Sequence, residues 1–145
     1  MASKAFVKDK IFEFFQTGVD AAYPTNPPEI AYPNVKFSPT METRWLSIIV
    51  LSGGAGQESL GSKGNRKYKR AGLITVMVMT PLYTGGTVES DTLSENIENI
   101  FEGEEIDLLD GSFCVFRNAT TIDTGRDGEF YQALVNVELE YRVIK

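Results

Sequence analysis

The sequence contains no histidine and one cysteine, and each scarcity excludes a class of site. Without histidine the chain has no Ser-His catalytic triad, no imidazole general base and no histidine metal ligand. Its single cysteine, Cys114, can form neither an internal disulfide nor a cysteine-rich zinc site. No run approaches about 20 apolar residues, so we expect no membrane span. The N-terminal segment lacks the apolar core of a signal peptide, and we expect folding in a reducing cytoplasm.

The composition is typical of one globular domain. The 145 residues are 42% hydrophobic and 23% charged, which predicts a single domain over residues 1–145 with a core that needs no disulfide or metal. Acidic residues outnumber basic residues by 20 to 14, and the net charge is −6. Because general DNA binding depends on Lys and Arg displacing phosphate counterions, this balance disfavours it.

Two segments have the periodicity of amphipathic helices. Apolar residues recur every three or four positions in residues 3–20, and we expect Gly18 and the proline-rich run 24–28 to end this helix. Residues 88–102 show the same pattern and stop at Gly103.

Strand patterns fill most of the remaining chain. Residues 43–52 and 71–80 are apolar on both faces, which predicts neighbouring strands in the middle of a sheet covered on at least one side. We expect them to pair as a hairpin, with a connection of about residues 53–69 that is far longer than the usual two to five residues. Residues 129–143 alternate between apolar and polar side chains, as in a strand with one solvated face. Weaker strand patterns cover three shorter segments: 29–40, where prolines favour a sheet edge, 112–117 and 119–124.

The order of helix, strands, helix and strands predicts an α+β fold. We expect a mixed or antiparallel sheet with two helices packed on it and a long loop between two central hairpin strands. Within this fold Cys114 and Trp45 are expected in the core, and Arg44 is expected to face outward.

A glycine-rich segment, residues 56–63, follows the first apolar strand with the spacing of a phosphate-binding loop. In such a loop the lysine precedes the serine or threonine, whereas here Ser62 precedes Lys63. The loop must also open a helix, but the next apolar pattern is that of a strand. A connecting loop is favoured, and nucleotide binding through this segment stays open as an alternative.

Charge is segregated along the chain. A basic stretch precedes the second apolar strand, whereas the chain between Ala71 and Phe116 carries nine acidic residues and no Lys or Arg. The plain interpretation is a solvated loop and a solvated helix face. The alternative is that a basic arm and an acidic wall meet between subunits, because a head-to-tail contact generates a ring when the rotation closes. The residues of this interface hypothesis are Lys63, Arg66, Lys67, Tyr68, Lys69, Arg70, Asp91, Glu95, Glu98 and Glu102. We identify no catalytic residues, metal ligands or cofactor site.

Several short motifs occur in the order found in one family of phage proteins. After the amphipathic helix come, in turn, Tyr32-Pro33-Asn34, Arg44-Trp45-Leu46, the segment Gln57–Gly61, the basic and valine-rich stretch Arg66–Met79, Pro81 before Gly85-Gly86, and the helix end Ile97–Gly103. Over about residues 4–142 the chain therefore resembles the tail terminator, or tail completion, proteins of long-tailed bacteriophages.

The resemblance implies a structural virion protein of the tail and neck, assembled in the host cytoplasm, with no enzymatic activity and no cofactor. Such subunits form a homohexameric ring that caps the tail tube, ends its elongation and presents a surface for head-tail joining to the connector. Genomic DNA passes through the lumen without sequence-specific binding. The loop from Gly53 to Arg70 would be an arm contacting a neighbour or the tube, and the acidic helix a ring or lumen surface. The alternative is another neck or tail component, such as a head-closure adaptor or a tail tube subunit.

Overall fold

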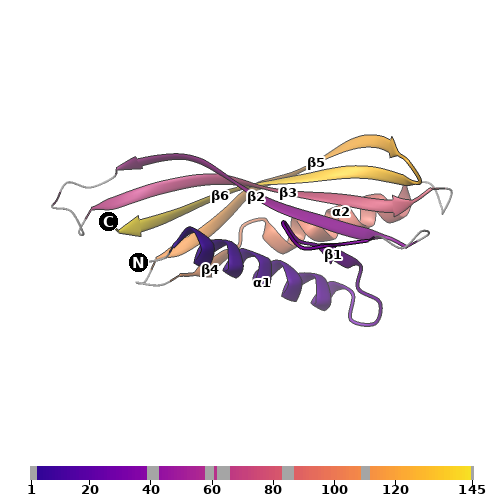
Figure 1. Cartoon of the computed structure of the whole chain (residues 1–145), viewed down its shortest axis with the longest axis horizontal. Helices are drawn as coiled ribbons and strands as arrows, with labels where there is room; N and C mark the ends of the chain where they lie inside the picture. The colour runs from indigo at the N-terminus through magenta and orange to yellow at the C-terminus, as the bar shows by residue number, and fades with distance from the viewer. Residues whose placement is uncertain are drawn as a thin grey trace.

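The computed structural model describes residues 3–38, 43–57, 61, 66–82, 87–108 and 112–144, which form a six-stranded sheet and two helices (Figure 1). The strand order is β1-β2-β3-β6-β5-β4; β1 runs parallel to β2, and the other neighbours are antiparallel. The predicted α+β fold with a mixed sheet is confirmed. The elements are α1 (Lys4–Ala22), β1 (Glu29–Ala31), β2 (Trp45–Gln57), β3 (Lys67–Pro81), α2 (Val88–Phe101), β4 (Glu105–Asp107), β5 (Phe113–Asp127) and β6 (Phe130–Ile144).

Ser3 is the N-cap of helix α1, and its hydroxyl oxygen accepts a hydrogen bond from the Phe6 backbone N–H at 3.1 Å. The expectation that Gly18 ends the helix is wrong, because α1 continues to Ala22. Gly18 lies inside the helix, where a Cβ would fall 2.7 Å from Cγ2 of Ile100. Its missing side chain therefore lets α1 approach α2, while the proline-rich run beyond the helix does end it.

Helix α2 follows the prediction closely. Its buried residues repeat at helical spacing, and Gly103, just past the C-cap residue, has the left-handed φ of +74° that favours glycine. Thr87 occupies the N-cap position but makes no capping hydrogen bond through its side chain. The buried residues of α2 are Ser90, Leu93, Ser94, Ile97 and Phe101.

Strands β2 and β3 form the expected hairpin, but they extend further than the sequence indicates. Pairing continues past a bulge between Ser52 and Ala55 and ends with Gln57 opposite Tyr68. The predicted limits of the connection are therefore wrong at both ends. The chain between the two strands is reduced to residues 58–66, which is still longer than a usual hairpin loop.

The C-terminal part of the sheet differs from the expected elements in two ways. The two weak patterns at 112–117 and 119–124 belong to one strand, β5, whose register shifts between Arg117 and Thr120. Asn118, within the shift, has a φ of 54°, and this local distortion interrupts the alternation that sequence reasoning follows. Strand β4 is an unpredicted edge strand of three residues, whereas β6 has the predicted extent and alternation.

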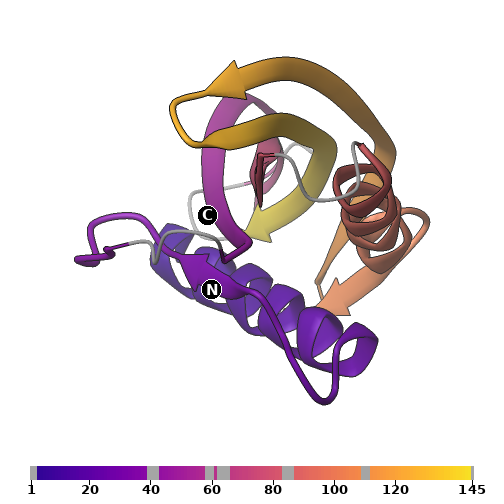
Figure 2. The same cartoon turned by 90° about the vertical axis from the view of Figure 1, so that its right-hand side faces the viewer.

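Both helices cover the same side of the sheet, which we call the inner face (Figures 1 and 2). Side chains from alternate strand positions pack there against the buried stripes of α1 and α2. Phe15 of α1 and Phe101 of α2 stack with ring centroids 5.7 Å apart, and Cys114 is fully buried as predicted. We call the opposite side the outer face. Inner-face residues from the long strands include Leu46, Ile48, Ile74, Val76, Val78, Cys114, Phe116, Val135, Val137 and Leu139.

Trp45 and Arg44 both differ from expectation. Trp45 is only half-buried and contacts the rings of Phe37 and Phe130 at centroid distances of 5.2 and 6.0 Å. Since Leu46 points to the inner face, alternation directs Trp45 away from the helices.

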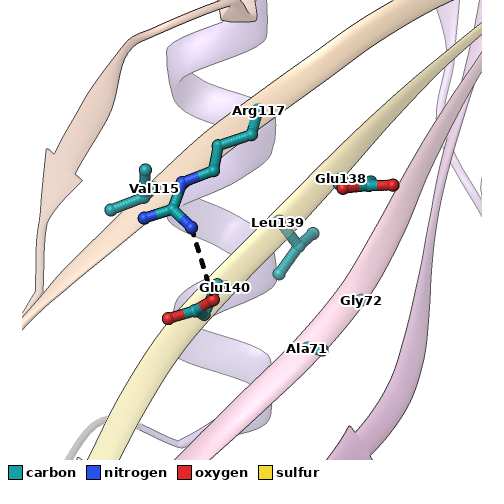
Figure 3. A pocket seen from close by; sticks show the side chains of 7 residues that line it. All are labelled: Ala71, Gly72, Val115, Arg117, Glu138, Leu139 and Glu140. Atoms are coloured by element: carbon teal, nitrogen blue, oxygen red, sulfur yellow. Dashed lines mark ion pairs between the residues drawn. The ribbon is translucent and has the colours of Figure 1, made fainter.

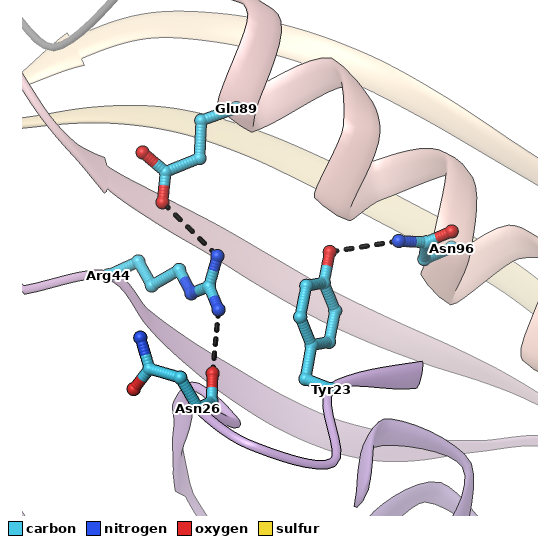
Figure 4. A network of polar contacts seen from close by, with 5 residues as sticks. All are labelled: Tyr23, Asn26, Arg44, Glu89 and Asn96. Atoms are coloured by element: carbon cyan, nitrogen blue, oxygen red, sulfur yellow. Dashed lines mark hydrogen bonds and ion pairs between the residues drawn. The ribbon is translucent and has the colours of Figure 1, made fainter. Parts of the chain in front are cut away.

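Arg44 does not face outward, because its side chain is only 19% exposed. Its guanidinium carbon lies 4.5 Å from the centre of the Tyr23 ring, and its nitrogens contact a Glu89 oxygen at 3.5 Å and the Asn26 carbonyl at 2.7 Å (Figure 4). The Tyr23 hydroxyl accepts a hydrogen bond from Asn96 at 2.9 Å. Arg44 therefore connects the end of α1, the start of β2 and helix α2.

Candidate assembly surfaces

The pleat of β3 divides the basic stretch between the two faces of the sheet. Lys67 and Lys69 are exposed on the outer face, whereas Tyr68 and Arg70 are half-buried on the inner face. Tyr68 packs against the hydrophobic core, and Arg70 lies opposite Tyr141 in the register with β6. These residues therefore do not form one continuous arm, and their role in an interface stays a prediction.

The two basic residues that precede β3 are placed differently. Arg66 lies at the entrance to the strand, where its Nε donates a hydrogen bond to the Gly61 carbonyl at 3.0 Å. Lys63, also part of the predicted interface, lies outside the described residues.

On the outer face, Lys69 belongs to a group of cations from three strands. Lys69 of β3, Arg117 of β5 and Arg142 of β6 each lie near a Glu140 oxygen, at 3.2, 3.7 and 3.7 Å respectively. The Glu140 side chain is 18% exposed, whereas the cations are 46, 59 and 42% exposed. We call Lys69, Arg117 and Arg142 the cation cluster. Sequence reasoning missed Arg117 and Arg142, because only the strand register brings them beside Lys69.

A hollow of about 240 Å³ lies next to the cation cluster (Figure 3). The small residues Ala71 and Gly72 leave this room on β3. Gly72 is required by the packing of the strands, since a Cβ there would fall 2.7 Å from the Leu51 carbonyl oxygen. The hollow is lined by Ala71, Gly72, Val115, Arg117, Glu138, Leu139 and Glu140.

Several apolar side chains lie on the outer face. Ile49, Leu51 and Ile122 are 38, 51 and 53% exposed, although antiparallel sheets with one open face usually present polar side chains there. A polar row crosses between them, because Thr75, Asn136 and Thr120 lie side by side in the strand register, and the Thr75 hydroxyl donates to the Asn136 side-chain oxygen at 3.0 Å. Exposed apolar groups gathered on one surface are typical of a contact site. We call Ile49, Leu51, Leu73, Met77, Ile122 and Leu134 the apolar patch.

Helix α2 and the chain after it carry the acidic residues. Glu98 differs from the predicted stripe, because it is half-buried and its carboxylate accepts a hydrogen bond from the Thr121 hydroxyl of β5 at 2.5 Å. Asp91, Glu95 and Glu102 are exposed, and α2 packs on the inner face, so the sheet lies between these three carboxylates and the cation cluster. We call these three residues, Asp91, Glu95 and Glu102, the acidic surface. Glu105 and Asp107 of β4 pair with Val115 and Phe113 and therefore lie on the outer face instead.

Comparison with known proteins identifies the family. The model of a family described as phage tail terminator protein matches residues 10–139. The chain belongs to this family. The resemblance inferred from the motifs is thus confirmed, and this tail terminator family protein is a structural component of the phage tail, in contact with other tail components.

Solved structures show that the fold is shared. Eleven chains of known structure match, and one of them, at 13% sequence identity, covers 100% of this chain and 99% of its own length with a TM-score of 0.74. At that identity the similarity demonstrates the fold alone. No curated protein sequence matches the chain significantly.

The described part of this tail terminator family protein does not have the geometry of a phosphate-binding loop. Gly56 and Gln57 extend β2, and the chain enters β3 at Lys67, where a P-loop would open a helix toward the phosphates. Among the described residues, no group of three or more Cys, Asp or Glu is placed to hold a metal ion. No described helix combines the length and apolar character needed to cross a membrane.

Proposed function

We propose that this protein forms a homohexameric ring that caps the tail tube, ends its elongation and provides the surface to which the head connector attaches. The observation that carries the proposal is the placement of opposite charges. The cation cluster lies on the outer face, and the acidic surface lies beyond the helices on the other side of the sheet. A contact between them must join different copies, and such head-to-tail contacts generate a ring when the rotation closes.

The proposed ring has three kinds of partner. It binds further copies of itself around the ring, the tail tube protein at one end and the head connector at the other. Genomic DNA passes through its lumen without sequence-specific binding. The net charge of −6 for each subunit supports this passage, because an acidic wall repels phosphate and discourages adhesion.

Particle size and symmetry test the ring. Light scattering of the purified protein should give about six times the 16.1 kDa subunit mass, and class-averaged electron micrographs should show sixfold symmetry. The measurement should be repeated with purified tail tubes, because some rings assemble only on a template. Monomers under both conditions would contradict the hexamer.

Deletion of the gene separates the terminator from the other tail and neck roles. Loss of a terminator should give over-long tails that are not joined to heads. Tails of normal length beside unjoined heads would instead indicate a head-closure adaptor, and the absence of tails would indicate a tube subunit.

A further inference from the structure

We propose that the outer face of the sheet is the docking surface for the acidic surface of a second copy of this chain. The inference rests on the proposed self-assembly and assigns the two surfaces that meet. The apolar patch supplies the buried area of the contact, and the cation cluster fixes its direction.

The apolar patch requires a cover that the described subunit does not provide. Both helices pack on the inner face, and the outer side chains of Ile49, Leu51 and Ile122 stay 38 to 53% exposed. Removing apolar surface from water stabilises a contact by roughly 25 cal/mol for each Å². A neighbouring protein surface is therefore the favourable cover for this face.

Charge selects which surface of the neighbour fits. The cation cluster surrounds a recessed carboxylate, Glu140, and its three cationic groups lie closer to solvent. The next acid, Glu138, already accepts a hydrogen bond from Asn118 at 2.8 Å. Two outer faces would bring two cation clusters together, whereas the acidic surface brings the three exposed carboxylates of α2 and its C-cap. The complementary pairing orients the contact head to tail and disfavours a face-to-face dimer.

Each of the two surfaces also has an apolar feature beside its charges. The hollow of about 240 Å³ opens on the outer face, beside the cation cluster. At the first residue of α2, Val88 is 70% exposed and offers an apolar side chain on the acidic side. The outer face thus presents both a charged and an apolar counterpart to α2.

Cross-linking between differently tagged copies tests the contact directly. One copy carries Leu51→Cys on the outer face, and the other carries Glu95→Cys on α2. The native Cys114 is fully buried and leaves a low background. A flexible bismaleimide should give a higher yield of cross-linked dimer for this pair than for two control pairs. In each control pair, Glu13→Cys of α1 replaces one of the two partners; the side chain of Glu13 is 71% exposed.

Charge reversal gives a second, independent test. The outer variant carries Lys69→Glu and Arg117→Glu, and the acidic variant carries Asp91→Lys and Glu95→Lys. Each variant alone should lose self-assembly, because like charges then face each other. An equal mixture should regain it, since alternating copies place opposite charges at every contact of an even-membered ring. Circular dichroism of each variant verifies that it is folded, and Lys10→Glu with Glu13→Lys in α1 is the matched control.

The outcomes separate this inference from the proposed ring. Wild-type rings without preferential linking of Leu51→Cys to Glu95→Cys would overturn the docking assignment and leave the ring intact. Monomeric wild type with no linking above the controls, even with tail tubes present, would overturn both. Linking of Leu51→Cys to the tube protein, or to the same position in a second copy, would assign the outer face to another occupant and overturn the inference.

Discussion

Gly18 of α1 packs directly against Ile100 of α2, and a Cβ at position 18 would lie 2.7 Å from the Ile100 Cγ2 atom. Carbon atoms do not approach so closely without a shift of one group. Cγ2 sits on the branched Cβ of Ile100 and cannot swing away as the end of a flexible chain would. The missing side chain of Gly18 therefore sets the distance between the two helices at this point.

Gly18→Ala should destabilise the fold by about 1–3 kcal/mol, as overpacked cores do. This loss should exceed the gain of roughly 1 kcal/mol that alanine brings to a helix interior. In an Ile100→Ala background the same substitution should become stabilising, because the clash is gone. Urea denaturation of the four chains measures the effect, and a stabilised single variant would show that the helices separate freely.

Arg44→Ala should lower the free energy of unfolding by about 2 kcal/mol, because it removes the stacking on Tyr23 and the charged contact with Glu89 together. Arg44→Lys should lower the free energy of unfolding by a smaller amount, since an ammonium keeps the charge but lacks the planar group that lies over the Tyr23 ring. The exposed pair of Lys10 with Glu13, 3.8 Å apart, provides the control. Lys10→Ala should change stability by no more than about 0.5 kcal/mol. Equal losses for Arg44→Ala and Lys10→Ala would contradict a structural role for Arg44.

Cys114 should make stability depend on pH in the alkaline range. Burial raises the pKa of Cys114 from 9.0 to about 12, although a hydrogen bond with the Glu140 backbone lowers it in part. Between these pH values the unfolded chain loses a proton that the folded chain keeps, so the free energy of unfolding falls as pH rises. Burial also raises the pKa of Tyr32 and of Tyr141.

Cys114→Ala isolates the contribution of the thiol, because the tyrosines are present in both chains. The free energy of unfolding, measured with urea, should fall less between pH 8 and pH 10.5 for the variant than for the wild type. Each ionising proton can change the free energy of unfolding by at most about 1.4 kcal/mol per pH unit. An equal fall in the free energy of unfolding for the wild type and the variant would show that the thiol ionises equally in the folded and unfolded states.

Lys69 and Arg70 are neighbours in the sequence with opposite placements, and their substitution should have different results. Lys69→Ser should leave stability within about 1 kcal/mol, as for exposed ion pairs, but weaken self-assembly. Arg70→Ser should lower the melting temperature, since Arg70 is half-buried on the inner face opposite Tyr141. Thermal melts and light scattering distinguish the two, and the same loss of assembly in both variants would argue against the division by face.

The fold could be predicted where a pattern is local and regular. Both helices and β6 follow from the spacing of their apolar residues, since a single buried face repeats along each element. The missed features depend on interruptions or on partners. β5 is continuous across the distortion at Asn118, and β4 has only three residues, Glu105–Asp107, two of them acidic. Such a short segment acquires its strand conformation from pairing with β5.

The candidate surfaces also depend on which strands pair, and this dependence limits what the sequence alone can predict about them. The division between Lys69 and Arg70 was available from the sequence, because alternation in a strand applies to charged residues as well as to apolar ones. The joining of Lys69 with Arg117 and Arg142 was not, because it requires the register of three strands. A run of charge in a sequence is therefore a poor guide to a patch whenever the run lies in a strand.

The difference in length between strands and helices has a consequence for local motion. A strand of 15 residues such as β3 spans about 50 Å, whereas the 19 residues of α1 span about 28 Å. Backbone amides near Lys67 and Lys69, toward the end of the sheet, should exchange their hydrogens with solvent through small openings, while those near Val76 should exchange only when the whole molecule unfolds. Docking of another molecule at that end would slow the faster exchange, so the least protected part of the sheet would also report most sensitively on assembly.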